Sequence, residues 1–375
     1  MLTKWLTLGR LFKKYFWRYN LQPEYVIFQS TSRCNLHCKH CFLWQGNQEW
    51  QNTNQGKYDL TLKEITKISQ SMKDFFFLNI GGGEPFTRSD LPQIAKIFYT
   101  NNHVQNLLIP TNGTLTKKIL ASTEAILKNC PNLNVHIDVS IDGIGPLHNK
   151  IREGNDTFNK AIKTIYELKK LNTNYPRLMV GTITAHMTYN QQHLGEIYSY
   201  IKTRLKPDSP TIALTRGTPR QPQAKDINID YYRKLTQTME RDFIQGKVAG
   251  FKNVLFWPLI MSTKILMHQM VIATYTKGYQ IPCLAGRLNV VIYSNGDVYP
   301  CEMLTDQKIG NLREVDYNFQ KLWQSTKLKR IVKKIVKTKC FCTHECHLPM
   351  NILYAPQSLP KLLILSLKIL AHHRQ

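Results

Sequence analysis

The chain has 375 residues, of which 42% are hydrophobic, and its 50 lysines and arginines outnumber its 25 acidic residues to give a formal net charge of +25. This length suits two domains, and the hydrophobic content argues against a wholly disordered chain. No uninterrupted apolar run reaches the length of a signal peptide or a membrane span, so we expect a cytoplasmic protein without transmembrane segments.

Residues 1–21 predict a basic amphipathic helix. Placed on a helix at about 100° per residue, most of the aromatic and aliphatic side chains gather on one side and most of the basic side chains on the other. This pattern is typical of a helix in the interface of an anionic membrane, and also of a helix whose apolar side packs on a core. The C-terminal stretch 351–375 has a similar basic, apolar composition, so both ends are candidates for peripheral membrane contact.

Three cysteines follow within eight positions, at Cys34, Cys38 and Cys41. An odd number of clustered thiols in a cytoplasmic chain argues against disulfides and favours a soft metal. Zinc would need a fourth ligand, for which His37 and His40 are candidates. An iron–sulfur cluster held by three thiolates would keep one iron open, and open coordination sites are where metals do chemistry.

Strand-like and helix-like segments alternate after the cysteines. Amphipathic stretches such as 61–72 and 158–171 predict helices, and short apolar runs predict six strands between them. Such alternation indicates parallel βα units, in which functional residues lie where the strands end. The cysteines, the glycine-rich turn, Asn112 and Ser140 all follow predicted strands. The strands are expected within residues 25–30, 75–85, 106–115, 134–143, 177–186 and 210–216.

The C-x3-C-x2-C spacing of residues 34–41 resembles the signature of the radical SAM superfamily. Gly82, Gly83 and Glu84, at the end of the next predicted strand, are similar to the glycine-rich motif of that family. The resemblance implies an incomplete (β/α)6 TIM-like barrel and a [4Fe-4S] cluster whose open iron binds S-adenosylmethionine. It further implies reductive cleavage of this cosubstrate to a 5'-deoxyadenosyl radical, with an electron from a low-potential donor.

The stretch 140–162 resembles the members of the family that modify peptides and proteins. In those members a serine and a later arginine help to hold the cosubstrate, and Ser140 and Arg152 stand at the matching positions. An arginine fork suits a carboxylate, although a solvated arginine at the start of a helix is the alternative. The resemblance implies that seven residues are candidates for binding the cosubstrate: Phe42, Gly82, Gly83, Glu84, Asn112, Ser140 and Arg152.

A second group of cysteines lies in the last third of the chain. Cys283 and Cys301 flank two strand-like runs around Asn295 and Gly296, a pair that favours the mirror-image turn of a β-hairpin. This part resembles the SPASM extension, which holds auxiliary [4Fe-4S] clusters. A full extension carries seven or more cysteines and this one has five, so we expect one auxiliary cluster in a shortened, twitch-like domain, with zinc as the alternative. The expected ligands are Cys283, Cys301, Cys342 and Cys346, with Cys340 as the alternate.

Charged residues near these motifs are further candidates. Glu302 follows Cys301, and in the sulfatase-maturing relatives an acidic residue at this place takes a proton from the substrate radical; pairing with a lysine is the alternative. Arg216 and Arg220 lie in a predicted loop near the barrel mouth. They are candidates for contacts with an anionic group of the substrate, and the alternative is that both side chains are solvated. Residues 317–344 contain eight basic residues and no acid, typical of a docked helix with a basic face or of a polyanion-binding surface.

Together these features predict a radical SAM enzyme with a small cysteine-rich second domain. The expected substrate is a peptide or protein side chain, and a membrane lipid or glycan precursor is the alternative. A non-enzymatic iron–sulfur scaffold would require the whole motif set to be coincidental, and no nucleic-acid-binding motif is present. The expected divisions are an N-terminal helix at 1–21, the core barrel at 22–240, the SPASM/twitch-like auxiliary domain at 241–350 and a basic apolar tail at 351–375.

Overall fold

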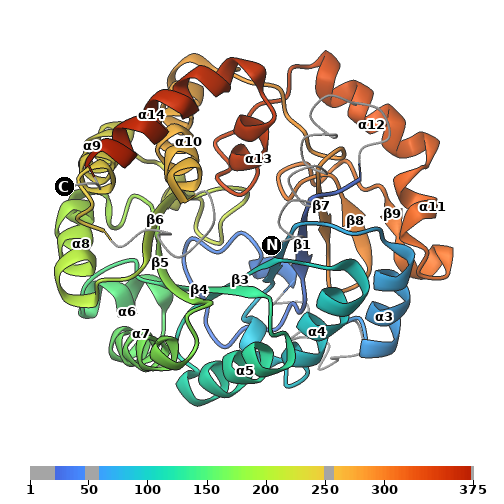
Figure 1. Ribbon diagram of the computed structural model, residues 1–375, viewed down its shortest axis with the longest axis horizontal. Helices are drawn as coiled ribbons and strands as arrows, with labels where there is room; N and C mark the ends of the chain where they lie inside the picture. The colour runs from blue at the N-terminus through green and yellow to red at the C-terminus, as the bar shows by residue number, and fades with distance from the viewer. Residues whose placement is uncertain (1–21, 47–58, 249–256, 373–375) are drawn as a thin grey trace.

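The computed structural model describes residues 22–46, 59–248 and 257–372 (Figure 1). In this part of the chain, nine strands form one curved sheet in the order β6-β5-β4-β3-β2-β1-β7-β8-β9. Strands β1 to β6 are parallel, and β7 adds to β1, also in parallel, before an antiparallel β7-β8-β9 edge. The strands are β1 (Tyr25–Gln29), β2 (Phe77–Gly81), β3 (Asn106–Thr111), β4 (Asn134–Ser140), β5 (Leu178–His186), β6 (Ser209–Leu214), β7 (Asn289–Ile292), β8 (Asp297–Tyr299) and β9 (Gly310–Asn311).

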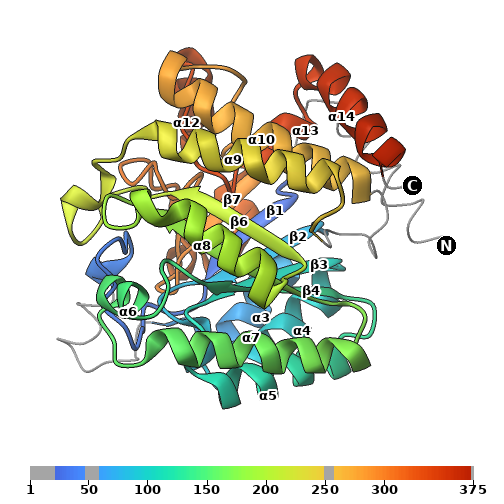
Figure 2. The same cartoon turned by 90° about the vertical axis from the view of Figure 1, so that its left-hand side faces the viewer.

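Helices that alternate with the parallel strands cover the outer side of this open barrel (Figures 1 and 2). They are α3 (Leu62–Ser71), α4 (Leu91–Asn102), α5 (Thr116–Asn129), α6 (Pro146–Arg152), α7 (Thr157–Asn174), α8 (Leu194–Tyr200) and α9 (Ile229–Ile244). The later helices are α10 (Trp257–Lys277), α11 (Phe319–Trp323), α12 (Thr326–Lys337), α13 (Leu348–Leu353) and α14 (Leu359–His372). Short helical turns are η1 (Pro85–Thr87), η2 (Gln191–His193), η3 (Ile201–Leu205), η4 (Pro222–Lys225), η5 (Leu312–Val315) and η6 (Pro356–Ser358).

The two faces of the sheet have different surroundings, as the alternating side chains of a strand require. In β3, Leu107 and Ile109 point outward and are buried under the helices. Leu108 and Pro110, on the inner face, are only half-buried. The main core therefore lies between the sheet and its outer helices, and the inner face of the barrel remains partly open.

The fold predicted from the sequence is confirmed. All six expected parallel strands are present at their expected places, with β6 beginning one residue early, and so are the helices of 61–72 and 158–171, the second of which extends over 157–174. A capping box of Thr61 and Glu64 begins α3: the Thr61 hydroxyl accepts from the Glu64 N–H, and the Thr61 N–H donates to the Glu64 carboxylate at 2.7 Å.

The predicted β-hairpin is also present, between β7 and β8, but its turn is of another type. Gly296 has φ of +89°, whereas Asn295 is not among the residues with positive φ. A mirror-image turn needs positive φ at both of its central residues. The Gly296 N–H donates to the Tyr293 carbonyl and the Tyr293 N–H to the Asp297 carbonyl, which is the pattern of an ordinary turn closed by a glycine bulge.

The last third of the chain packs against the barrel at two places. Helices α11 and α12 extend the main core, and Arg313 pairs with Glu64 at 2.8 Å between Nε and Oε1. Helices α9, α10, α13 and α14 form a second apolar core near the β6 edge (Figure 2). Residues 1–21, for which we predicted a helix, lie outside the described residues. None of the described helices combines the length and the apolar character needed to cross a bilayer.

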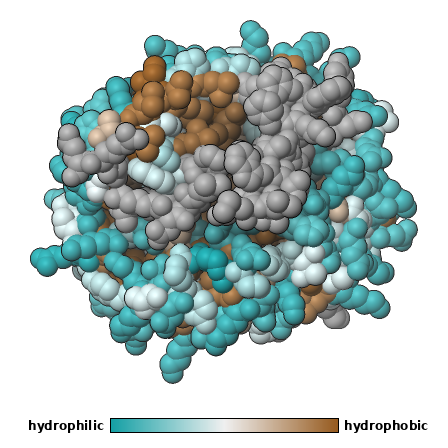
Figure 3. All heavy atoms as spheres, viewed as in Figure 1, coloured by the Kyte–Doolittle hydropathy of each residue, from teal (hydrophilic) through white to brown (hydrophobic). Residues whose placement is uncertain are grey.

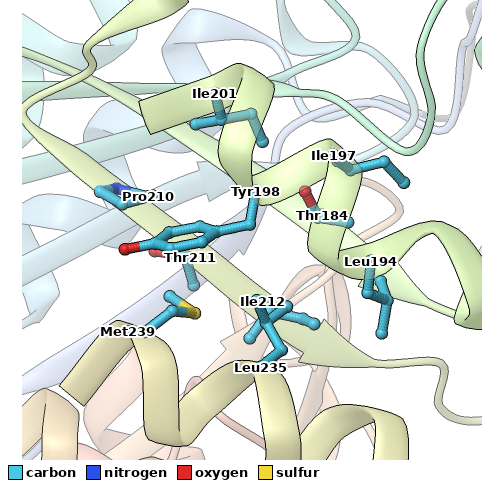
Figure 4. A pocket seen from close by; sticks show the side chains of 10 residues that line it. All are labelled: Thr184, Leu194, Ile197, Tyr198, Ile201, Pro210, Thr211, Ile212, Leu235 and Met239. Carbon is cyan, nitrogen blue, oxygen red and sulfur yellow. The ribbon is translucent and has the colours of Figure 1, made fainter. Parts of the chain in front are cut away.

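A small apolar pocket lies on the outer side of the sheet, between β6, α8 and α9 (Figure 4). Its lining includes Ile197, Ile212 and Met239 but no cysteine and no charged side chain. The hydroxyl of Tyr198, another lining residue, donates to Asp242 at 3.0 Å. The pocket thus belongs to helix–sheet packing and is separate from the residues singled out in the sequence.

Candidate active site at the barrel mouth

The three N-terminal cysteines lie on the loop that follows β1, and the glycine-rich turn after β2 holds this loop in place. The Gly83 N–H donates to the Thr31 carbonyl and the Glu84 N–H to the Arg33 carbonyl, both at 2.8 Å. A Cβ at Gly82 would overlap the Thr31 carbonyl oxygen, and one at Gly83 that of Arg33. We expected these glycines to admit a ligand; in the structure they admit the backbone of the cysteine loop.

The surroundings of these thiols suit a metal group. Burial, with Glu84 and the neighbouring cysteines, raises the pKa of Cys34 to about 12. Burial also raises the pKa of Cys38 to about 11, although Arg152 opposes this. Thiols with such pKa values are protonated at neutral pH, so they become thiolates only when a cation replaces the protons.

The three thiols do not form a compact site for a single ion as they stand. Among the described residues, two groups of three ligand atoms lie within 4.8 Å of one another, and neither contains Cys34, Cys38 or Cys41. Zinc–sulfur bonds of about 2.3 Å would bring tetrahedral thiolates to about 3.8 Å from one another, so the three side chains would have to move to share one zinc ion.

Glu84 links the ends of β2 and β3. Its Oε1 accepts from the Thr111 hydroxyl and its Oε2 from the Asn112 N–H, both at 2.8 Å. Burial raises the pKa of this carboxyl to about 7, although these hydrogen bonds act in the opposite direction. The Asn112 side chain in turn donates to Asn35, between two of the cysteines, at 2.9 Å. The ends of three neighbouring strands thereby share one polar network.

Arg152 is buried beside the cysteines. It is the last residue of α6 and is 7% exposed, so the alternative of a solvated arginine at a helix start is wrong. Its Nε and Nη2 donate to Asp142 Oδ2 at 2.7 and 2.6 Å. Burial alone would raise the pKa of Asp142, but Arg152 and His40 hold it below its usual value. Ser140 lies two residues before Asp142, at the end of β4, and is also buried.

The loop after β6 covers the cysteine loop. The Arg220 N–H donates to the Cys41 carbonyl at 2.9 Å, and the Arg220 side chain pairs with Glu153. The Arg216 guanidinium lies over the Phe42 ring, 5.3 Å from its centroid. The side chains of both arginines therefore have acidic or aromatic partners within the protein, so neither is simply a solvated loop residue.

Four of the five C-terminal cysteines form one group. The Cys283 and Cys340 side chains are hydrogen-bonded. Cys301 lies within electrostatic reach of Cys340 and Cys342. Burial raises the pKa of Cys342 to about 11, so this thiol needs a cation to ionise, whereas the hydrogen bond with Cys283 lowers the pKa of Cys340 to about 7. Near this group α12 packs against the segment that leads into β7, because Leu328 and Val332 lie close to Gly286.

Cys346 lies apart from this group, on the barrel side. It packs with Tyr25 and Val291, on the inner face of the sheet. Its sulfur accepts from Arg216 Nη1 at 3.7 Å and lies within 4.8 Å of ligand atoms of Glu302 and His344. The geometry thus brings together Cys283, Cys301, Cys340 and Cys342, whereas the ligand set expected from the sequence had Cys346 in place of Cys340.

A buried polar chain connects the two cysteine groups. Glu302 accepts from Gln29 at 2.5 Å and contacts His344 Nε2 at 2.7 Å. His344 Nδ1 faces Arg216 Nη1, which can only donate, so Nδ1 accepts and Nε2 donates to Glu302. Glu302 is therefore paired with a histidine rather than with a lysine. Burial alone would raise the pKa of this carboxyl, but His344 and Arg216 lower it to about 2.

Sequence reasoning missed several members of this site. Asp142, Gln29 and the histidines of the last cysteine motif were not singled out. His344 and His347 alternate with cysteines in residues 340–347, which was a usable signal because both residue types bind metals. The groups of ligand atoms within 4.8 Å are Glu302, His344 and Cys346, and Cys301, His344 and His347.

Comparison with known proteins agrees with this site. Residues 28–201 match the radical SAM superfamily, and residues 283–347 match the SPASM iron–sulfur cluster-binding domain. The chain is 24% identical over 314 residues to the mycofactocin maturase MftC of Mycolicibacterium smegmatis, covering 83% of this chain and 73% of MftC. It is 27% identical over 291 residues to a probable GTP 3',8-cyclase of Methanococcus maripaludis, covering 74% of this chain and 91% of that protein.

Among solved structures, SuiB of Streptococcus suis bound to its precursor peptide SuiA has a similar fold. The TM-score is 0.58 at 17% identity, and the match covers 86% of this chain and 70% of SuiB. Both segments with family matches contain a cysteine group described above, and the strand order supplies the barrel that joins them. The chain therefore belongs to the radical SAM superfamily of enzymes and carries a SPASM iron–sulfur cluster-binding domain.

Proposed function

We propose that this enzyme abstracts hydrogen from a peptide or protein side chain. The likeness to a maturase and to an enzyme with its precursor peptide supports this substrate class. The observation that carries the proposal is the junction at Arg216. This side chain touches Phe42 of the first cysteine loop and also Glu345 and Cys346, which follow Cys342 in the chain, so the segments that carry the two cysteine groups meet at Arg216.

Cys34, Cys38 and Cys41 hold the first cluster, with S-adenosylmethionine bound beside it. When bound, this pair supplies a 5'-deoxyadenosyl radical after receiving an electron from an external low-potential donor. The protein side chains orient the cosubstrate. Arg152, fixed by Asp142, presents its guanidinium next to Cys38, where it suits a carboxylate. The remaining cosubstrate-binding candidates are Phe42 on the cysteine loop and, at the strand ends, Gly82, Gly83, Glu84, Asn112 and Ser140.

The auxiliary cluster is held by Cys283, Cys301, Cys340 and Cys342. Four thiolates would suffice to hold a [4Fe-4S] cluster, which would supply electron transfer or structural support. Glu302, next to Cys301, has both carboxylate oxygens in contact with Gln29 and His344. It orients the junction between the two cysteine groups and is poorly placed to take a proton from a substrate.

The inner face of the barrel receives the substrate side chain. His136 and Asp138 lie on this face below Ser140, with His136 Nε2 and Asp138 Oδ1 3.0 Å apart. His136, Leu108 and Pro110 are half-buried, so solvent and a flexible side chain reach this face. A polar pair next to the cosubstrate end of β4 suits a peptide group better than a purely apolar ligand.

The test uses oxygen-free, cluster-reconstituted protein with S-adenosylmethionine and dithionite. We expect 5'-deoxyadenosine to form, and to form faster with a precursor peptide encoded beside the gene. Mass spectrometry should then find a modified peptide that the variant lacking Cys34, Cys38 and Cys41 does not produce. A parallel reaction contains GTP in place of the peptide. Turnover of GTP without modification of any such peptide would move the assignment to a small-molecule cyclase, as in the second relative named above.

A further inference from the structure

Helix α14 has two apolar faces, and only one of them is covered. Leu362, Leu365 and Ile369 are buried against the second core, and Ser366 is 2.9 Å from Ser262 of α10. On its other side four large aliphatic residues are between 44% and 62% exposed. These are Leu359, Leu363, Ile364 and Leu367. Figure 3 shows hydrophobic surface gathered on this side of the molecule.

The exposed face has the geometry of an interfacial helix. At about 100° per residue, the four exposed aliphatic residues span an arc of roughly 140°. Lys368 and Lys361 are exposed and follow on one flank of this arc, and His372 comes directly after them on the helical wheel. Such lysines can extend beside an apolar face toward the head groups of a bilayer.

The charges of α14 itself and of α10 beneath it are basic. The sequence has no aspartate or glutamate between Asp242 and Asp297, which includes all of α10, and none after Glu345. Helix α9, which also packs on α14, does contain acidic residues, but Glu240 accepts a hydrogen bond from Gln269 of α10 and Asp242 pairs with Lys202. The apolar stripe on α14 is therefore flanked by the lysines of its own helix, and their positive charge is complementary to an anionic surface.

We propose that the outer face of α14 is a docking surface for an anionic lipid membrane. A second copy of the chain is the less suitable occupant, because two such faces would bring Lys361 and Lys368 of both copies together. A nucleic acid would suit the charge but not the leucines. Helix α12 makes the contrast clear: it is more basic, but its Leu328, Ile331 and Ile335 are buried, so it offers charge without an apolar stripe.

The test is co-sedimentation of the full chain with two kinds of vesicle, phosphatidylcholine alone and phosphatidylcholine mixed with phosphatidylglycerol. We expect binding to the mixed vesicles that weakens as salt rises. The combined variant Leu363→Gln, Ile364→Gln and Leu367→Gln should lower the partition coefficient about tenfold or more, because it removes the inserted surface. These side chains are exposed, so the fold should persist, and circular dichroism and 5'-deoxyadenosine formation check this.

Two further variants separate the sources of binding. Val336→Gln on α12 removes another exposed aliphatic side chain, 56% exposed, and should bind vesicles like the unaltered chain. Lys361→Gln with Lys368→Gln should weaken binding to the mixed vesicles only. The proposal is overturned if the unaltered chain ignores phosphatidylglycerol at low salt, or if the α14 leucine variant still binds but deletion of residues 1–21 abolishes binding. It is equally overturned if the leucines instead support a concentration-dependent dimer.

Discussion

The two cysteine groups of this enzyme are built in opposite ways. The first takes its three thiols from one loop of eight residues, and the backbone of the neighbouring strand end fixes that loop. The second collects four thiols from both sides of a hairpin and from the segment after α12, across Cys283 to Cys342. One site is thus determined locally, and the other depends on the tertiary packing of distant segments.

The difference between the two sites also extends to their charged neighbours. Next to the first group, Arg152 and Asp142 form a buried ion pair, which is costly to bury and suits the recognition of a charged ligand. The second group lies at the margin of the main core: Cys301 is buried in it, and Cys283 and Cys340 are partly buried and pack against it. We infer that the first site binds a charged cosubstrate and that the second is a closed electron-transfer or structural centre.

The largest expected effect is at the first site. Changing Cys34, Cys38 and Cys41 together to alanine should abolish 5'-deoxyadenosine formation, because no other thiols lie on that loop to hold the cluster. Chromatography of reaction mixtures measures this. The matched control is Cys130→Ala: Cys130 is completely buried in the main core, away from both groups, and its loss should leave formation measurable. Undiminished formation by the triple variant would refute the assignment of the site.

A smaller effect is expected from Arg152→Lys. Lysine keeps the charge but cannot donate from two nitrogens to Asp142 as the guanidinium does. We expect the rate of 5'-deoxyadenosine formation to fall roughly 10- to 100-fold, as when groups that support a metal site are removed. The iron content should stay unchanged. Lys202→Arg, at an ion pair with Asp242 far from the site, is the control and should have no effect. A fully active Arg152→Lys enzyme would place the cosubstrate carboxylate elsewhere.

At the auxiliary site the comparison concerns Cys340 and Cys346. In the background without Cys34, Cys38 and Cys41, the reconstituted protein should bind about four irons per chain. Cys340→Ala should lower this number, whereas Cys346→Ala should not, because Cys346 faces Arg216. Iron and zinc are measured together by elemental analysis. If Cys346→Ala lowers the iron content and Cys340→Ala does not, the ligand set expected from the sequence is correct. If the protein binds zinc and no iron, the centre is structural.

Much of the fold followed from local patterns. The parallel strands could be placed because apolar runs and amphipathic helices alternate, and turn residues mark the ends of the strands. Pairing across long separations was not predictable: β7 lies beside β1 because the barrel leaves that edge of the sheet open. The hairpin could be found but its turn type could not, since Asn-Gly is compatible with more than one turn.

The site was predictable where its chemistry is local. The cysteines and the glycine-rich turn follow from spacing, but the role of Gly82 and Gly83 depends on a contact with Thr31 and Arg33, some fifty residues away. The partners of Arg216 also lie far along the chain: His344 is 128 residues further on. No periodic pattern encodes such pairs, so Cys346 could not be separated from the other cysteines by sequence alone.

The smallest expected effect concerns the junction that joins the two groups. In Glu302→Gln one carbonyl oxygen must replace two carboxylate oxygens, which receive donors from Gln29 and His344. His344 cannot move its proton to Nδ1, because that nitrogen accepts from Arg216. One donor is therefore left without an acceptor, and we expect a loss of about 1–3 kcal/mol in the free energy of unfolding. Denaturant unfolding of the anaerobic protein measures this loss, and 5'-deoxyadenosine formation should persist.

The matched control is Glu345→Gln in the same loop. Glu345 Oε1 accepts from the Leu214 N–H at 2.7 Å, and an amide oxygen can keep that bond. Its Oε2 lies 3.6 Å from Arg216 Nη1, beyond hydrogen-bond distance, and burial raises the pKa of this carboxyl to about 7, so a neutral amide should cost less here than at Glu302. Equal losses in the two variants would mean that Glu302 and His344 do not form the directed pair described here. Normal turnover of the true substrate by Glu302→Gln would agree with an orienting role. If the variant still forms 5'-deoxyadenosine but no modified substrate, Glu302 instead acts as the base that takes a proton from the substrate radical.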